Sequence, residues 1–210
     1  MRPFLLLVAL AAAPSTGLSQ SARPEGWQVR ADAGAPDSSV AYDRMPPGWH
    51  ITTGPGSILF DPANQARGRF AVEAEIHLFP GESNEGFGVF IGGTNLQAAA
   101  ESWTAFLITR DGSATIERRQ NGSTTVLYPL TKGASIKPHA GGEGTALNTI
   151  RVLVQGDSAV FSANGQRITA IGARELLLEG TFGFRVGKNV NLHVTNLDLV
   201  TRLAPFPIRR

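Results

Sequence analysis

Short segments in which apolar and polar residues alternate, each closed by a turn signal, constrain the fold of this chain more than any other feature. Between Phe70 and Leu78 the alternation is nearly strict, and Glu73, Glu75 and His77 occupy the positions between apolar residues. Successive side chains of a β-strand point to opposite faces, so the pattern predicts a strand with one buried face. The two carboxylates and the imidazole then project together from the other face.

Turn dipeptides separate the later segments. Asp111-Gly112, Asn121-Gly122 and Asn164-Gly165 each stand between two alternating segments. Such pairs favour tight hairpins, because both central residues can adopt positive φ. We therefore expect a three-stranded meander over residues 103–128. Together with 24 Gly and 13 Pro, the pattern predicts an all-β fold of about a dozen strands.

The chain divides by composition into four parts. It begins with one arginine, a run of ten apolar residues from Phe4 to Ala13, and then small residues, which is the pattern of a cleavable secretory signal. The run is half of the about 20 residues needed to span a bilayer. We expect a signal peptide at 1–21, a loose Pro- and Gly-rich segment at 22–48, a β-sandwich domain at 49–201 and a C-terminal tail at 202–210. The expected location is secreted or periplasmic.

Composition and charge exclude several classes of function. The chain has no cysteine, which excludes thiol catalysis and Cys-ligated zinc. The net charge is +2 and the basic residues are scattered, so nucleic acid is not an expected partner. No further apolar stretch is long enough to cross a membrane. The four histidines lack the spacing of zinc motifs, and no Asp ladder for calcium is present, so we expect no metal and no cofactor. The sequence does not indicate an oligomeric state.

Three segments carry a resemblance to a known family. They are the strand at 68–76, the apolar strand after Asn84-Glu85-Gly86, and the ending from 162 to 186 with its Asn-Gly hairpin and Gly-x-x-Gly-Phe strand. Over about residues 49–200 the order of elements resembles concanavalin A-like lectin/glucanase domains, and especially the bacterial 3-keto-disaccharide hydrolase-like domain. The resemblance implies a jelly-roll sandwich of two antiparallel sheets with a ligand on the concave sheet face.

The resemblance does not extend to a glucanase active site. Glucanases of this superfamily carry Glu-x-Asp-x-x-Glu on one strand. The most similar stretch here, Glu73-Ala74-Glu75-Ile76-His77, lacks the central Asp and the distal Glu. No complete catalytic set is therefore identified, and catalytic residues are not assigned.

Two groups of residues are candidates for binding a ligand. On the first strand, alternate side chains are about 7 Å apart, whereas the carboxyl groups of a retaining glycosidase are about 5 Å apart. On the meander, basic and acidic side chains either pair across strands or hydrogen-bond sugar hydroxyls, beside a tryptophan that belongs to the core or offers a stacking surface. The candidates are Glu73, Glu75, His77, Trp103, Arg110, Glu117 and Arg119.

These observations support three hypotheses. The first is an exported, lectin-like module that binds carbohydrate or a cell-envelope ligand on the concave sheet face without catalysis. The second is a glycoside-acting hydrolase of the 3-keto-disaccharide type, with Glu73 or Glu75 and His77 as the acid and base. The third is a structural, protein-binding component of the cell envelope, which would present a flat apolar patch.

Overall fold

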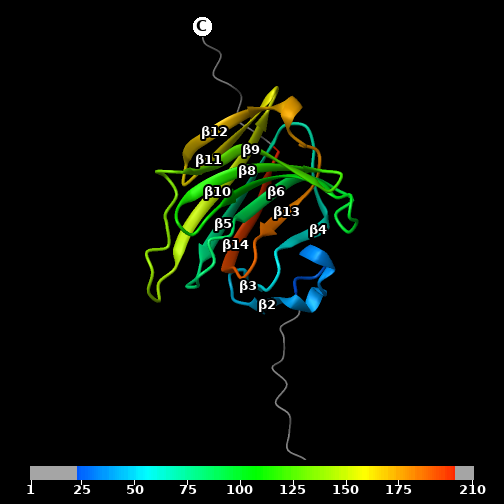
Figure 1. Ribbon diagram of the computed structural model, residues 1–210. Coiled ribbons are helices and arrows are strands. Elements are labelled where there is room, and N and C mark those ends of the chain that lie inside the picture. The colour runs from blue at the N-terminus through cyan, green and yellow to red at the C-terminus, as the bar shows by residue number, and fades with distance from the viewer. Residues whose placement is uncertain (1–22, 202–210) are drawn as a thin grey trace, which may run out of the picture.

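The computed structural model describes residues 23–201, so the predicted signal peptide and the whole predicted C-terminal tail lie outside the described residues. Fourteen strands form two antiparallel sheets of seven strands each, packed face to face as a β-sandwich (Figure 1). The predicted all-β sandwich is confirmed. The helices among the described residues are three-residue turns, and none of them is a candidate membrane span.

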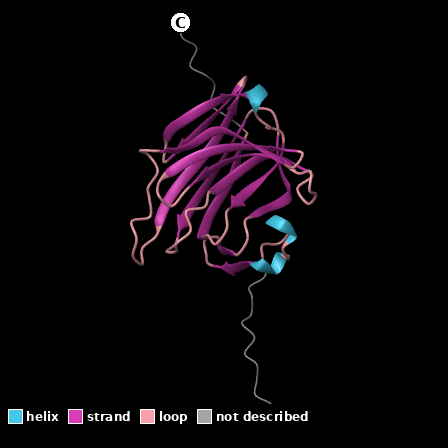
Figure 2. Cartoon of the chain, in the orientation of Figure 1, coloured by secondary structure: helices cyan, strands magenta, loops and turns pink. Residues whose placement is uncertain are grey.

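In spatial order, sheet I contains β1 (Gln28–Ala31), β4 (Ser57–Ala66), β13 (Gly180–Val186), β6 (Phe87–Thr94), β7 (Ser102–Ile108), β8 (Ser113–Gln120) and β9 (Ser123–Lys132). Sheet II contains β12 (Gln166–Gly172), β11 (Ser158–Ala163), β10 (Ala146–Gln155), β5 (Phe70–Leu78), β14 (Asn191–Val200), β3 (Trp49–Thr53) and β2 (Val40–Arg44). Between residues 23 and 201 the chain also forms three 3-10 turns, η1 (Asp32–Gly34), η2 (Asp37–Ser39) and η3 (Ala173–Glu175), shown in cyan in Figure 2.

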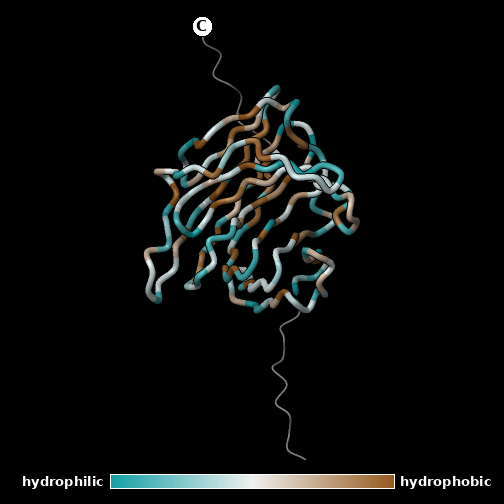
Figure 3. The backbone as a smooth tube through the Cα atoms, viewed as in Figure 1, coloured by the Kyte–Doolittle hydropathy of each residue, from teal (hydrophilic) through white to brown (hydrophobic). Residues whose placement is uncertain are grey.

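The core lies between the sheets and follows from the alternation of the strands. Along β5 the apolar side chains at every second position are buried, while Glu73, Glu75 and His77 are only partly buried, as predicted. Apolar positions recur along the strands of both sheets (brown in Figure 3). Phe106 of sheet I meets Phe161 of sheet II edge to face, with ring centroids 5.6 Å apart. Such contacts stabilise the sandwich by removing apolar surface from water.

The predicted meander is also confirmed. Strands β7, β8 and β9 are consecutive neighbours in sheet I. In the turn between β8 and β9, Asn121 has φ 51° and Gly122 has φ 80°, the backbone that an Asn-Gly hairpin needs. The Asp111-Gly112 turn differs, since only Gly112 has positive φ; there the Asp111 carboxylate accepts hydrogen bonds from Thr109 Oγ1 and Ser113 N instead.

Two segments differ from the expectation. The segment predicted to be loose contributes an edge strand to each sheet, β1 and β2, and buries Val29, Val40 and Tyr42. These strands are short and are surrounded by turn-forming residues. Their alternation of buried and exposed positions is therefore too brief to be recognised in the sequence. The composition of residues 97–101 and 173–176 favours a helical turn in each; the first segment forms non-helical turns, and the second contains η3.

A second apolar cluster lies on the outer face of sheet I, away from the main core. Its members are Ile58, Phe60, Phe90, Leu96, Trp103, Ala105 and Leu107. Leu96 comes from the segment between β6 and β7, which folds over this face and is held there by Gln97, whose Nε2 donates to Gln28 Oε1 across 3.1 Å. This segment and the side chains around it cover part of the sheet and leave the rest open to form a site.

Candidate ligand-binding site

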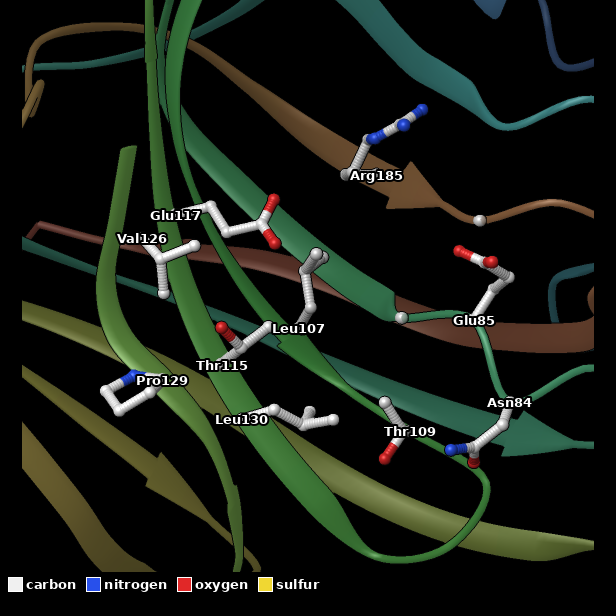
Figure 4. A pocket seen from close by; sticks show the side chains of 12 residues that line it. Asn84, Glu85, Leu107, Thr109, Thr115, Glu117, Val126, Pro129, Leu130 and Arg185 are labelled. Carbon is white, nitrogen blue, oxygen red and sulfur yellow. The ribbon is translucent and has the colours of Figure 1, made fainter. Parts of the chain in front are cut away.

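A hollow of about 520 Å³, here called the groove, lies on the outer face of sheet I (Figure 4). Its polar lining comes from Asn84, Glu85, Thr109, Thr115, Glu117 and Arg185. Its remaining lining comes from Gly86, Leu107, Val126, Pro129, Leu130 and Gly187. Strands β7, β8, β9 and β13 and the loop before β6 therefore build one site from segments that are distant in the sequence.

Glu117 reaches the groove because of the alternation of β8. Its neighbour Ile116 is in the main core, so Glu117 points to the outer face, opposite Ala105 and Val126 on the adjacent strands. Burial raises the pKa of the Glu117 carboxyl; the charge of Arg185 opposes this rise and that of Glu85 adds to it. Figure 4 shows Glu117 and Glu85 both reaching into the groove. The site thus holds two carboxylates in different environments.

Arg185 projects from β13 beside the groove and is fixed in place by Asp32. The two side chains form a bidentate pair, with Nη1–Oδ1 3.1 Å and Nη2–Oδ2 2.6 Å. A guanidinium held in this way by a carboxylate has restricted motion. Arg185 is therefore presented to the groove in a fixed orientation, with part of its surface still exposed.

A smaller hollow of about 200 Å³, here called the recess, adjoins the groove. Glu117 and Arg185 line both. The other residues of the recess are Arg30, Asp32, Ala33, Ile58, Glu101, Trp103, Arg119 and Thr124. The two hollows together follow the outer face of sheet I from β9 toward β1.

Glu101 anchors the recess although only 1% of its side chain is exposed. Its Oε1 accepts a hydrogen bond from Arg119 Nε across 2.5 Å and forms an ion pair with Arg30, whose Nη1 lies 2.8 Å away. Arg119 also donates from Nη1 to Thr124 Oγ1 across 2.9 Å. The buried carboxylate thus holds two guanidiniums at the rim of the recess.

The groove also has an apolar wall that faces solvent. The exposed large hydrophobic side chains among residues 23–201 are Met45, Val126, Leu130 and Val200, and two of these line the groove. Exposed apolar side chains grouped around a hollow are typical of a binding surface, whereas isolated ones need no explanation. The groove combines fixed polar groups with an apolar contact surface.

The structure divides the predicted site residues between the two sheets. Trp103, Glu117 and Arg119 come together at the recess. Trp103 is only 4% exposed and packs in the outer apolar cluster, so its ring has no open face for stacking. Arg110 lies apart from both hollows; its guanidinium donates to the carbonyl oxygens of Ser83 and Phe79, each across 2.9 Å.

The other three predicted residues project from sheet II and line neither hollow. Glu73 Oε2 lies 3.6 Å from Arg151 Nη1 on β10. Glu75 Oε2 accepts from Thr195 Oγ1 across 3.1 Å. These contacts are the ordinary cross-strand pairs of a solvated sheet face. His77, by contrast, lies in an arrangement that the sequence did not indicate.

Three of the four histidines form a row across sheet II. His193 on β14 is directly opposite His50 on β3 and His77 on β5, and the rings of His77 and His193 have centroids 5.8 Å apart. Burial, and then the neighbouring His193, lower the pKa of both His50 and His77. Among residues 23–201, no three His, Cys, Asp or Glu side chains are arranged so that they could hold a metal ion.

Several residues of the hollows were not predicted from the sequence. Glu101 lies in a stretch that resembles a helical turn, and Arg30 and Asp32 lie in the segment expected to be loose. Arg185 is the polar residue in the apolar stretch from Phe182 to Val186. That isolation is a usable signal, because a charge within a mostly buried strand needs a partner.

No protein-family model matches the chain, and no curated protein matches it. Solved structures do match. The carbohydrate-binding module CBM66 from Bacillus subtilis aligns with a TM-score of 0.62 at 12% identity, covering 84% of this chain and 96% of that one. The chain has the concanavalin A-like jelly-roll fold. This confirms the predicted resemblance at the level of the fold; the resemblance to the 3-keto-disaccharide hydrolase-like domain stays a prediction.

Two further structures share this jelly roll. The GH16 protein of the Bacteroides ovatus mixed linkage glucan PUL aligns with a TM-score of 0.60 at 9% identity. The alignment covers 85% of this chain and 96% of that one. Sheep galectin-11 aligns with a TM-score of 0.50 at 14% identity, covering 75% of this chain and 100% of that one. At such identities the likeness shows the fold alone, so function has to be argued from the site.

Proposed function

We propose that this protein binds carbohydrate on the outer face of sheet I, in the groove and the adjoining recess. One observation carries the proposal: two adjoining hollows on a single sheet face share a partly buried carboxylate, Glu117, and a fixed guanidinium, Arg185. The site is concave and has a few polar groups in fixed positions, which is the usual form of a small-ligand site.

The chemistry of the groove suits a sugar. A sugar hydroxyl both donates and accepts hydrogen bonds; Glu117 and Glu85 accept and Arg185 donates. The Thr115 hydroxyl donates its proton to the Tyr128 carbonyl oxygen, so toward a sugar it acts as an acceptor. The volume of about 520 Å³ falls within the range of about 300 to 1,000 Å³ for ligand sites. The apolar wall of the groove supplies a surface for the C–H face of a sugar ring.

The names of the structural relatives agree with this proposal at the level of the fold. They include a carbohydrate-binding module, a galectin and a GH16 protein of mixed linkage glucan. A jelly roll also supports unrelated functions, so the residues of the groove, and not the fold, decide between the alternatives.

Hydrolysis of a glycoside is the second candidate function, because two carboxylates line the same groove. Glu117, whose pKa burial raises, would donate a proton to the leaving glycosidic oxygen. Glu85 would take a proton from the water that attacks the anomeric carbon. This assignment replaces Glu73, Glu75 and His77 as the acid and base of the hydrolase hypothesis.

The test is a binding screen with matched variants. The protein is screened against a glycan array, and each saccharide that binds is measured by calorimetry with wild type, Glu117→Gln and Glu75→Gln. The two variants make the same chemical change on opposite sheets. We expect Glu117→Gln to weaken binding about tenfold and Glu75→Gln to leave it unchanged. Equal effects, or a loss only in Glu75→Gln, would contradict a site on sheet I.

The same saccharides distinguish binding from hydrolysis. Incubation with wild-type protein followed by chromatography shows whether the saccharide is cleaved. Cleavage that disappears in Glu117→Gln supports the hydrolase, and an intact saccharide supports a binding module without catalysis. If no saccharide binds, the protein-binding envelope component becomes the favoured function.

Export is part of the same proposal and rests on the sequence of residues 1–21. A secreted or periplasmic location would place the groove where free and cell-wall glycans occur. N-terminal sequencing of the protein recovered from a cell fraction tests it: a mature terminus close to residue 22 in an extracellular or periplasmic fraction supports export. A full-length chain in the cytosol contradicts export.

A further inference from the structure

Two buried polar atoms, on side chains that line the recess, have no hydrogen-bond partner in the protein. They are Glu101 Oε2, an acceptor, and Trp103 Nε1, a donor. Both side chains line the recess and are more than nine-tenths buried. Buried polar groups nearly always have a partner, so each exception requires an explanation. A donor and an acceptor in one recess are complementary to hydroxyl groups, which both accept and donate.

The side chains that line the recess carry equal numbers of positive and negative charges. Three guanidiniums line it, from Arg30, Arg119 and Arg185, and three carboxylates line it, from Asp32, Glu101 and Glu117. A ligand with a net charge would be attracted by one set and repelled by the other. An uncharged ligand with several hydroxyls can hydrogen-bond to both sets.

The size of the recess limits what can enter it. Its volume is about 200 Å³, below the range of about 300 to 1,000 Å³ for drug-sized ligands. A cavity of about 150 Å³ is enough for one benzene ring. The recess therefore has room for a single ring, while the groove beside it has room for more of the same molecule.

We propose that the recess is a specificity subsite for one ring of an uncharged saccharide, with ring hydroxyls bound by the Trp103 indole N–H and the Glu101 carboxylate. This inference rests on the proposed function, because the rest of the saccharide lies in the groove. It adds a ligand class: neutral oligosaccharides bind, and uronate-containing ones do not.

The experiment uses a change that keeps the aromatic ring and removes only the N–H donor. Calorimetric titrations of gluco-, manno- and galacto-tetrasaccharides and of tetragalacturonate are made with wild type, Trp103→Phe and Trp49→Phe. Trp49 is on the opposite sheet, in β3, so its variant is the matched control. We expect at least one neutral tetrasaccharide to bind, Trp103→Phe to weaken it about tenfold, and Trp49→Phe to have no effect.

A second readout does not depend on the folding of the Trp103 variant. The indole N–H signals of Trp27 and Trp49 are assigned by their Phe variants, which leaves that of Trp103 identified. In wild-type protein, the neutral tetrasaccharide that binds is expected to shift the Trp103 indole signal more than the other two. An unshifted Trp103 signal overturns the subsite even when the groove binds sugar.

The outcomes separate the subsite from the proposed function. Binding of a neutral tetrasaccharide that is insensitive to Trp103→Phe overturns the subsite and leaves carbohydrate binding intact. Preferential binding of tetragalacturonate overturns the neutral ligand class. The absence of binding by any of the four probes overturns the subsite, and it overturns the proposed function as well when the glycan array also yields no saccharide that binds.

Discussion

The guanidinium of Arg119 on β8 donates from Nε to Oε1 of Glu101 across 2.5 Å, at the entry to β7. Arg30 of β1 forms an ion pair with the same oxygen. One buried carboxylate thus connects the edge strand β1 to the meander and shapes the recess. Breaking a buried ion pair by removing one partner is far more costly than losing a surface pair, because the remaining charge stays buried.

Replacement of Glu101 by alanine is therefore expected to destabilise the protein strongly. Two arginine side chains that are only 19% and 28% exposed lose their shared carboxylate, and the expected loss in the free energy of unfolding is about 3 kcal/mol. Urea denaturation measures it. Glu143→Ala, at an exposed position in the loop between β9 and β10, is the control and is expected to change stability by less than about 0.5 kcal/mol. Similar values for both variants would show that the cluster contributes no stability.

The histidine row is expected to make stability depend on pH. Burial and the neighbouring His193 lower the pKa of His50 and of His77 in the folded protein, while Asp43 and Glu75 oppose the shift at His50 and His77, respectively. Below an ordinary pKa of about 6.5, the unfolded chain binds protons that the folded protein does not, so stability falls as pH falls from there.

Thermal unfolding at pH 7.5 and at 5.5 measures this dependence. His50→Asn and His77→Asn, each of which removes one imidazole from the row, are expected to reduce the loss of melting temperature. His139→Asn, in the loop between β9 and β10, is the control and is expected to keep the wild-type difference. A wild-type protein with the same melting temperature at both pH values would contradict the expectation.

Glu117→Gln is expected to increase stability and weaken binding at the same time. Burial raises the pKa of Glu117, so its ionisation opposes folding above that pKa, and Gln removes this cost at pH 7. A stabilising change that reduces function is typical of residues that serve a site. Melting temperatures at pH 7 test stability, with Glu75→Gln as the control. A lower melting temperature for Glu117→Gln would show that its charge supports folding.

Gly88→Ala is expected to destabilise sheet I. A Cβ at this position would lie 2.1 Å from the carbonyl oxygen of Phe106 on β7, so one of the two strands has to shift. Overpacking of this kind costs about 2 kcal/mol. Gly144→Ala is the control, because nothing lies within 4 Å of its added Cβ. Equal stability of the two variants by urea denaturation would mean that the strands adjust without cost.

The sequence predicted the parts of the fold that depend on local pattern. Strict alternation identified β5 and its polar face, and turn dipeptides identified the β7–β8–β9 meander. Alternation states which side chains share a face of one strand, but not which sheet that strand joins. For this reason Glu75 and Glu117 were both candidates for binding the same ligand, although long-range strand pairing places them on opposite sheets.

The candidate site was predicted less well, for the same physical reason. The recess is assembled from β1, β4, β7, β8, β9 and β13, and no local spacing relates them. Glu101 follows three alanines in the sequence, where nothing indicates burial, and its burial depends on guanidiniums from two distant strands. The histidine row likewise joins residues that only the pairing of β3, β14 and β5 brings together.

The central claim is that the ligand binds on the outer face of sheet I. The most direct measurement is an amide chemical-shift titration of the protein with a saccharide identified by the glycan screen. The largest shifts are expected at Leu107, Thr115, Glu117 and Val126, which lie on three adjacent strands of the groove. Shifts concentrated at Glu73, Glu75 and His77 on sheet II would contradict the claim and return the site to the opposite face of the sandwich.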